Sequence, residues 1–301
     1  MNERIRVANA PCSWGVLEFD LQGEAAPWQR VLDEMAAAGY AGTELGDWGF
    51  LPTEPVALGA VLAPRSLDMV GAFVPVRFRD PDAATEAIPR AIRTARLLSA
   101  VNPRALVVLA DDNCTDPVRD ACAGRIRPDQ GLSHSEWCTF AAGVERVARA
   151  VSDATGLGSV FHHHGGGFVE PPAEVDTLLD LTDPALVSLC LDTGHFAFGG
   201  GDPLACLQRH ADRIRHVHFK DCDPAVADRA RREKWDYTTA VRHGVFSELG
   251  RGSVPFREIL AALSARSWTG WIVVEQDVLP GMGTPFESAV RNREYLRQLG
   301  L

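Results

Sequence analysis

Short apolar runs alternate along the chain with longer stretches in which hydrophobic residues recur at helical spacing. The runs are bounded by Gly, Pro or Asp, and their length is typical of buried strands. The eight runs expected to form strands are Ile5–Ala10, Gly42–Leu45, Asp68–Phe73, Ala105–Ala110, Ser159–His163, Val187–Leu191, Ile214–Phe219 and Trp271–Glu275. The stretches expected to form the helices that follow them are Trp28–Ala38, Thr53–Leu62, Pro81–Ser99, His134–Thr155, Pro172–Leu181, Pro203–His210, Val254–Ser264 and Pro285–Leu299.

A strand followed by a helix, repeated eight times, favours parallel strands joined through helical crossovers. The economical topology is one closed (β/α)8 TIM barrel over residues 1–301, with about 38 residues per repeat. An open doubly wound sheet is the alternative, and it would normally carry a glycine-rich dinucleotide turn after the first strand. Pro11–Gly15 stands there instead, so we expect the barrel.

Two connections are longer than the others and account for the length beyond a minimal barrel. They run over residues 111–132, after the fourth strand, and 221–252, after the seventh. Long loops in compact domains are usually functional or disordered. The second contains Trp235, Tyr237 and Phe246, so we interpret it as a lid or as a subunit contact in a homo-oligomer, not as a second domain.

Composition and charge narrow the class of protein. Hydrophobic residues make up 46% and charged residues 23%, which is typical of a globular chain and excludes disordered and fibrous classes. The net charge is −10, and Glu233 interrupts the densest basic run, which is formed by Arg229, Arg231, Arg232 and Lys234. Nucleic-acid binding is therefore not expected. No apolar stretch is long enough to span a bilayer.

Two further features predict a cytoplasmic location. Met1–Arg6 leads directly into the first strand without an apolar signal segment. The seven cysteines are scattered and include no CxxC arrangement, so we expect reduced thiols.

Polar residues collect where the expected strands end. In a parallel barrel these carboxyl ends form one rim, which is where active sites lie. The rim residues are Trp14, Glu44, His162, His163, His164, Asp192, His195, His216, His218, Lys220, Asp221, Glu275 and Asp277. They include six of the nine histidines of the chain.

The histidine-rich strand ends have two interpretations each. Strand alternation sends His162 and His164 to one face and His163 to the other. The pair of His162 and His164 suits a metal, an anionic substrate or ordinary core hydrogen bonding. His216, His218 and Lys220 likewise share a face. A lysine beside a metal ligand is costly unless a carboxylate or substrate oxygen lies between them, and the alternative is a structural salt bridge.

Three acidic residues end strands at the same rim. Asp192 suits a metal ligand, a catalytic residue or the cap of the next turn. Glu275 and Glu44 follow apolar strand positions, where an unpaired carboxylate is expensive, so each needs a metal or a cation as partner.

Together, His162, Asp192, His218 and Glu275 provide two nitrogen and two oxygen ligands from four successive strands. Such a set suits Mn²⁺, Co²⁺, Zn²⁺ or Fe²⁺ better than Ca²⁺ or Mg²⁺. We expect a divalent metal there, with Mn²⁺ or Co²⁺ first. Whether His162 or His164 is the direct ligand stays open from the sequence.

The chain resembles the xylose-isomerase-like TIM-barrel superfamily of sugar isomerases and epimerases and, within it, the inosose dehydratase family. The matching segments are Ala10–Gly15, Gly39–Gly46, His162–His164, Asp192–His195 with Gly200–Pro203, His216–Asp221 and Val273–Glu275. They cover the chain from end to end in the expected order. The triple histidine followed by glycines is the most specific of them.

The resemblance implies a metal held by strands five to eight, which in isomerase and epimerase relatives is bound by Glu, Asp, His and Glu. His162 stands here where those relatives carry the first glutamate. Epimerases of this kind use two metal-bound glutamates as a proton-transfer pair, and this chain keeps only Glu275. The departure fits a lyase, which needs a base at one carbon and an acid at the leaving hydroxyl.

The resemblance thus implies metal-dependent dehydration of a keto-cyclitol, of the 2-keto-myo-inositol type, in inositol catabolism. The ion would polarise the ketone, and Lys220 would help to stabilise the enediolate. Glu275 and Glu44 are the candidate bases, and His164 and His195 the candidate acids. Trp14, His195, His216 and Asp221 are expected to contact the substrate.

Three alternatives share the metal. The first is an isomerase or epimerase of a keto-sugar or inosose. The second is an enzyme that catalyses elimination from a 3-keto-glycoside, and the third is a phosphodiesterase similar to the endonuclease IV relatives. The acidic charge balance argues against the last. A non-catalytic sugar-binding barrel has no need of the full ligand set that this chain retains.

Overall fold

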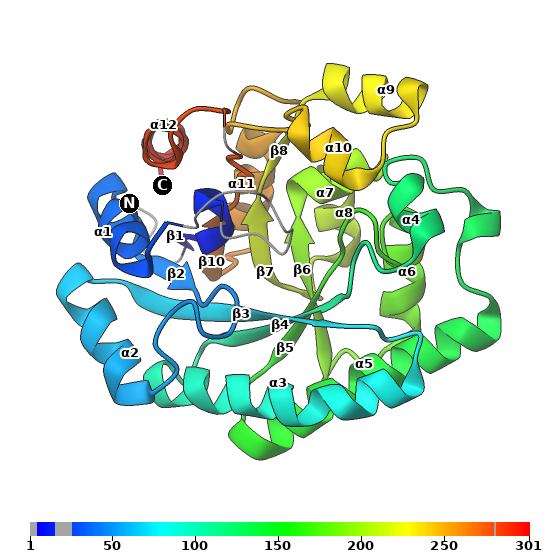
Figure 1. Ribbon diagram of the computed structural model, residues 1–301, viewed down its shortest axis with the longest axis horizontal. Helices are drawn as coiled ribbons and strands as arrows, with labels where there is room; N and C mark the ends of the chain where they lie inside the picture. The colour runs from blue at the N-terminus through cyan, green and yellow to red at the C-terminus, as the bar shows by residue number, and fades with distance from the viewer. Residues whose placement is uncertain (1–4, 16–25, 280) are drawn as a thin grey trace.

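The computed structural model describes residues 5–15, 26–279 and 281–301, and in this part of the chain eight parallel strands close into a barrel (Figure 1). The order around the barrel is β1, β10, β7, β6, β5, β4, β3, β2. Their bounds are β1 Ile5–Asn9, β2 Gly42–Glu44, β3 Asp68–Val76, β4 Leu106–Asp111, β5 Ser159–His162, β6 Val187–Asp192, β7 Ile214–Phe219 and β10 Gly270–Val274. The expected TIM barrel is confirmed.

Helices follow the strands and surround the barrel (Figure 1). The helices that return the chain to the next strand are α1 Trp28–Ala38, α2 Pro55–Leu62, α3 Pro81–Val101, α5 His134–Thr155, α6 Pro172–Leu181, α8 Pro203–His210, α11 Phe256–Ala265 and α12 Pro285–Gln298. All of them agree with the expected helices to within two residues at each end.

Local chemistry explains several of these boundaries. Asp202 accepts hydrogen bonds from the backbone N–H groups of Leu204 and Ala205 and so caps α8. Ser133 and Glu136 form a capping box at the start of α5. Gly156 ends α5 at a φ of 75°, a left-handed conformation that favours glycine.

The two long connections are partly helical and lie against each other on one side of the barrel (Figure 1). The first contains α4 (Pro117–Ala121), and the second contains α9 (Pro224–Glu233) and α10 (Tyr237–Arg242). The second also begins and ends in a two-stranded antiparallel sheet, β8 (Asp221–Cys222) with β9 (Phe246–Ser247). Arg231 donates to the carbonyl of Gly124, and Arg125 donates to that of Trp235, which joins the two insertions.

All seven cysteines are free in the structure, and three of them, Cys190, Cys206 and Cys222, are buried. In the part of the chain described, no helix has the length and apolar character needed to cross a membrane. Residues 1–4, which belong to the expected leaderless N-terminus, lie outside the described residues.

Candidate active site and metal centre

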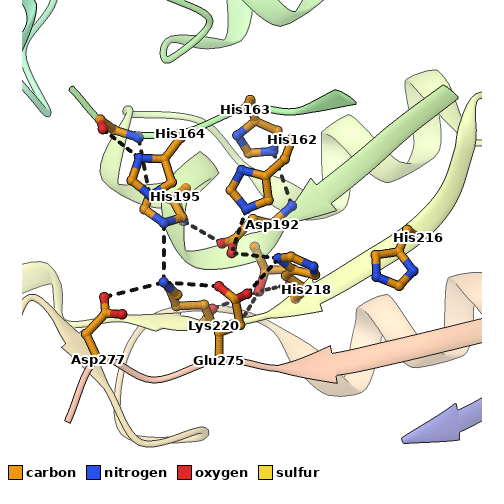
Figure 2. A network of polar contacts seen from close by, with 12 residues as sticks. His162, His163, His164, Asp192, His195, His216, His218, Lys220, Glu275 and Asp277 are labelled. Atoms are coloured by element: carbon orange, nitrogen blue, oxygen red, sulfur yellow. Dashed lines mark hydrogen bonds and ion pairs between the residues drawn. The ribbon is translucent and has the colours of Figure 1, made fainter. Parts of the chain in front are cut away.

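A pocket with a cavity volume of about 90 Å³ opens at the carboxyl ends of the barrel strands. Among the described residues its lining is formed by Ala10, Pro11, Cys12, Glu44, Gly46, Asp47, Phe73, His162, His164, His218, Lys220, Tyr237, Glu275 and Asp277. The four residues expected to do the chemistry, Glu44, His164, Lys220 and Glu275, all belong to this lining. The polar floor of the pocket is drawn in Figure 2.

The four expected metal ligands come together beneath this pocket. Ligand atoms of His162, Asp192, His218 and Glu275 all lie within 4.8 Å of one another, and all four side chains are buried. Asp192 Oδ2 is 3.6 Å from His162 Nε2 and 3.8 Å from His218 Nδ1, and His218 Nδ1 is 3.2 Å from Glu275 Oε1 (Figure 2). Strand register explains the arrangement, because Asp192 and His218 are direct partners in the β6–β7 pairing.

The chemistry of this group fits a divalent cation. Within the described residues, the buried atoms Asp192 Oδ2 and His218 Nδ1 have no hydrogen-bond partner. Buried polar atoms are normally satisfied, so two unsatisfied acceptors facing each other indicate an ion between them. Burial alone would raise the pKa of Asp192, but His162, Lys220 and His218 hold that pKa below its usual range. The carboxylate is therefore ionised and ready to bind a cation.

The geometry separates the two candidate histidine ligands of strand five. His162 belongs to the four-residue group, whereas His164 lies beside it with a ring centroid 5.5 Å away. The third histidine, His163, faces away from the pocket and accepts a hydrogen bond from the backbone N–H of Asp192 at 3.2 Å. The expected alternation along this segment therefore holds, and His162 is the better placed ligand.

Lys220 lies next to the four expected metal ligands, and one of them, Glu275, separates it from His218. Its Nζ is 3.3 Å from Glu275 Oε2 and 3.4 Å from Asp277 Oδ2 (Figure 2). The other oxygen of Glu275, Oε1, faces His218. Burial opposes the charge of Lys220, but Asp277 and Glu275 raise its pKa above the ordinary value, so it remains a cation. The carboxylate required between a lysine and a metal ligand is thus present.

Glu44 reaches across the barrel to two histidines of β7. Its Oε1 lies 2.7 Å from His216 Nε2 and 3.0 Å from His218 Nε2. Burial alone would raise the pKa of Glu44, but His218 and His216 hold it well below the usual range. Glu44 is therefore a carboxylate whose pKa suits hydrogen-bond acceptance better than proton abstraction.

His164 forms a pair with Tyr237 from α10. Its Nδ1 lies 2.7 Å from the carbonyl of Gly165, which requires the proton on Nδ1 and leaves the lone pair on Nε2. The Tyr237 hydroxyl is 3.4 Å from that Nε2. Burial, together with His162 and Lys220, puts the pKa of His164 well below its ordinary value, so the imidazole is neutral.

The loop that carries His164 is fastened by buried charges from the first insertion. Arg119, which is fully buried, binds both carboxylate oxygens of Glu174 at 2.8 and 2.6 Å and donates to the carbonyl of Gly167. Glu174 also accepts the backbone N–H of Val169, which has a φ of 95° that non-glycine residues rarely adopt. The strained turn therefore depends on the Arg119–Glu174 pair.

We expect the substitution Arg119→Met to lower the free energy of unfolding by about 3–5 kcal/mol, because it leaves the buried Glu174 without its countercharge. Chemical denaturation monitored by circular dichroism measures this loss. The matched control is Arg209→Met, whose ion pair with Asp176 is formed by a largely exposed arginine and is worth less than about 1 kcal/mol. Equal losses in the two variants would contradict the assignment.

Four residues were expected to bind substrate, namely Trp14, His195, His216 and Asp221. None of them belongs to the described pocket lining, so their placement does not support that expectation. Trp14 is buried in the core and donates to Glu34, because the one-turn helix Pro11–Trp14 directs Pro11 and Cys12 to the pocket instead. His216 lies one layer below the rim on β7, as Figure 2 shows.

The other two of these residues have structural partners. Asp221 accepts backbone N–H groups from Gly250, Gly252 and Val254 and so secures the end of the second insertion. His195 accepts the N–H of Gly165 and lies behind His164, at 3.8 Å between ring centroids.

The pocket also contains residues that were not assigned a role from the sequence. Asp277 was recognised only as a rim residue, and Tyr237 only as one aromatic residue of a long connection. Tyr237 follows Asp236, which accepts the N–H of Thr239 and caps α10. A capped helix with an aromatic first residue was the available signal, but nothing local shows where that helix lies.

Comparison with known proteins places the chain in a family. The sequence profile of the "Xylose isomerase-like TIM barrel" family matches residues 32–299. The chain is 34% identical to an inosose dehydratase of Geobacillus kaustophilus, over 98% of this chain and 94% of that one. It is 33% identical to an inosose dehydratase of Lacticaseibacillus casei, over 97% and 96% of the two chains.

A solved structure shows the same fold at lower similarity. A probable 3-DHS dehydratase from Bacillus anthracis superposes with a TM-score of 0.69 at 13% identity, over 97% of this chain and 98% of that chain. The expected resemblance is therefore confirmed by a profile match over residues 32–299 and by relatives aligned over nearly the whole chain. The chain belongs to the xylose isomerase-like TIM barrel family, near the inosose dehydratases within it.

Proposed function

We propose that this protein is a metal-dependent hydro-lyase that dehydrates a keto-cyclitol of the 2-keto-myo-inositol type. The observation that carries the proposal is the buried group of His162, Asp192, His218 and Glu275, with its unsatisfied acceptor atoms, at the floor of the pocket. The full-length similarity to inosose dehydratases supports the substrate class.

His162, Asp192, His218 and Glu275 are the residues that would hold the ion. A bound divalent cation supplies Lewis acidity, which polarises a substrate carbonyl and makes the neighbouring C–H more acidic. The mixed nitrogen and oxygen set favours Mn²⁺ or Co²⁺, with Zn²⁺ or Fe²⁺ as alternatives.

Glu275 is the preferred base for the proton α to the ketone. It lines the pocket, and its carboxylate lies between His218 and Lys220. Glu44 is the weaker base candidate, because its Oε1 already accepts from two imidazoles. Proton abstraction by a positioned carboxylate contributes about 10²–10⁴-fold to the rate.

Lys220 stabilises the negative charge that develops on the substrate oxygens, since it is the one lysine of the pocket lining among the described residues. The leaving β-hydroxyl needs a proton, and the Tyr237–His164 pair is a proton-bearing group of the same pocket lining. Because His164 is neutral and hydrogen-bonded through Nδ1, the Tyr237 hydroxyl is the donor in this pair. His195 lies 3.3 Å from Lys220 Nζ through its Nε2 and packs against His164, so it acts through these two residues.

An isomerase or epimerase of a keto-sugar is the alternative activity, and the ligand set argues against it. A two-base mechanism needs a second glutamate at the metal, and His162 occupies that position. The same elimination on a 3-keto-glycoside needs only a different pocket shape.

Product analysis tests the activity. Incubation of the Mn²⁺- or Co²⁺-loaded protein with 2-keto-myo-inositol is expected to give a product lighter by one water, with a new ultraviolet absorbance from the conjugated enol-dione. Mass spectrometry and absorbance measure both. A product of unchanged mass would establish an isomerase or epimerase and contradict the proposal.

A further inference from the structure

One oxygen of Glu44 accepts hydrogen bonds from two histidines of the same strand. Glu44 is on β2, whereas His216 and His218 are on β7, so the contact crosses the barrel interior. All three side chains are buried. A carboxylate oxygen has no proton to give, so both imidazoles must carry their proton on Nε2.

This requirement determines the second nitrogen of His218. A neutral imidazole with its proton on Nε2 has its lone pair on Nδ1. His218 Nδ1 is the atom that faces Asp192 and Glu275, at 3.8 and 3.2 Å, and it has no hydrogen-bond partner among the described residues. The hydrogen bond on one side of the ring therefore presents the lone pair to the metal group on the other side.

We propose that Glu44 is a positioning residue that locks His218 in the Nε2–H tautomer and so prepares Nδ1 for the metal. His216 supports it by donating to the same oxygen, which fixes the orientation of the carboxylate. The inference rests on the metal centre of the proposed function and adds a role for a residue outside the four ligands.

Two other roles for Glu44 fit the contacts less well. As a base it would have to abstract a proton while its Oε1 is engaged by two N–H donors. As a ligand of a second metal, together with His216 and His218, it would need the lone pairs of both Nε2 atoms. The distances of 2.7 and 3.0 Å to one oxygen are those of N–H···O hydrogen bonds, which occupy these positions with protons.

The test compares Glu44→Gln with Glu44→Ala. The glutamine retains a carbonyl oxygen that accepts both N–H groups but is no base, whereas the alanine removes the acceptor. We expect Glu44→Ala to weaken Co²⁺ binding about 10–100-fold, which is typical when the hydrogen-bond partner of a metal-binding histidine is lost. The visible Co²⁺ spectrum should also change. Glu44→Gln is expected to keep most of the Co²⁺ affinity, because the acceptor for both N–H groups remains. Isothermal titration of the metal-free protein gives affinity and stoichiometry.

The matched control is Asp176→Ala, which removes a carboxylate from an imidazole, His210, away from the pocket and should leave Co²⁺ affinity unchanged. If Glu44→Ala fails to fold, the ¹⁵N spectrum of histidine-labelled wild-type protein loaded with diamagnetic Zn²⁺ decides, because His218 must then carry its proton on Nε2 and bind the ion through Nδ1. An Nδ1–H tautomer would overturn the proposal.

Two titration results would also overturn it. Glu44→Gln as inactive as Glu44→Ala, with metal affinity unchanged in both, would make Glu44 the base. Two Co²⁺ ions per wild-type chain and one in Glu44→Ala would make it a ligand. Failure of the proposed function is separate, because wild-type protein would then bind no metal or would release no water from the keto-cyclitol.

Discussion

Replacement of Asp192 by asparagine is expected to abolish tight metal binding and turnover together. Asp192 Oδ2 is the unsatisfied acceptor between His162 and His218, and the substitution removes its negative charge. Loss of a residue behind a ligand already costs about 10–100-fold in metal affinity, so loss of a ligand is expected to cost more than about 100-fold. Asparagine is chosen because Asp192 Oδ1 also caps α7 (Thr193–Phe198) by accepting the N–H of His195, and asparagine caps as well as aspartate.

Metal analysis after gel filtration and initial-rate assays measure the two losses. Asp176→Asn is the matched control, because it changes an aspartate paired with a histidine outside the pocket and should retain both metal and activity. Thermal unfolding shows whether either variant is misfolded. An active Asp192→Asn or Asp192→Ala protein that holds no metal would contradict the mechanism.

Replacement of Lys220 by methionine is the second substitution with a large expected effect. Methionine preserves much of the apolar stem and removes only the charge. We expect kcat to fall about 10²–10³-fold, which is typical when a group that stabilises developing negative charge is lost. Metal content should change little, because none of the four expected ligands is altered.

The same substitution is expected to lower stability. Lys220 is buried against Glu275 and Asp277, and breaking a buried ion pair costs about 3–5 kcal/mol. Bound metal offsets part of this loss, since it binds only the folded protein. Steady-state kinetics on metal-loaded protein and denaturation with and without metal separate the two effects. Wild-type kcat in Lys220→Met would remove Lys220 from the mechanism.

The barrel was predictable because each repeat carries its own signals. Ile214–Phe219 and Pro203–His210 were predicted with the boundaries that they have in the structure, from an apolar run and from the Asp202-Pro203 start. Closure of the sheet into a barrel was expected because the strand–helix unit repeats eight times. Most boundaries that differ do so by one or two residues, as at Val101, where α3 continues past the expected Ser99. The largest difference is at β3, which continues three residues past the expected Phe73 to Val76.

The grouping of the four candidate metal ligands was predictable for a related reason. His162, Asp192, His218 and Glu275 end four successive strands, and the parallel topology alone brings their side chains to one rim. Alternation along β7 also placed Lys220 on the face of His218. Sequence therefore determines which residues meet at the floor of the pocket.

The walls of the pocket were not predictable in the same way. Tyr237 reaches the pocket because the second insertion packs against the first, through contacts such as that of Arg231 with Gly124. Those contacts are long-range and have no local pattern. The position of Trp14 was not predictable either, because one turn of helix after β1 turns it into the core, where it donates to Glu34.

The most direct test of the account is a metal titration of the metal-free protein with turnover of 2-keto-myo-inositol as the readout. The account predicts no activity without metal, a linear rise to one equivalent of Mn²⁺ or Co²⁺ per chain, and a product lighter by one water at every point. Full activity in the metal-free protein, or a product of unchanged mass at saturation, would contradict it.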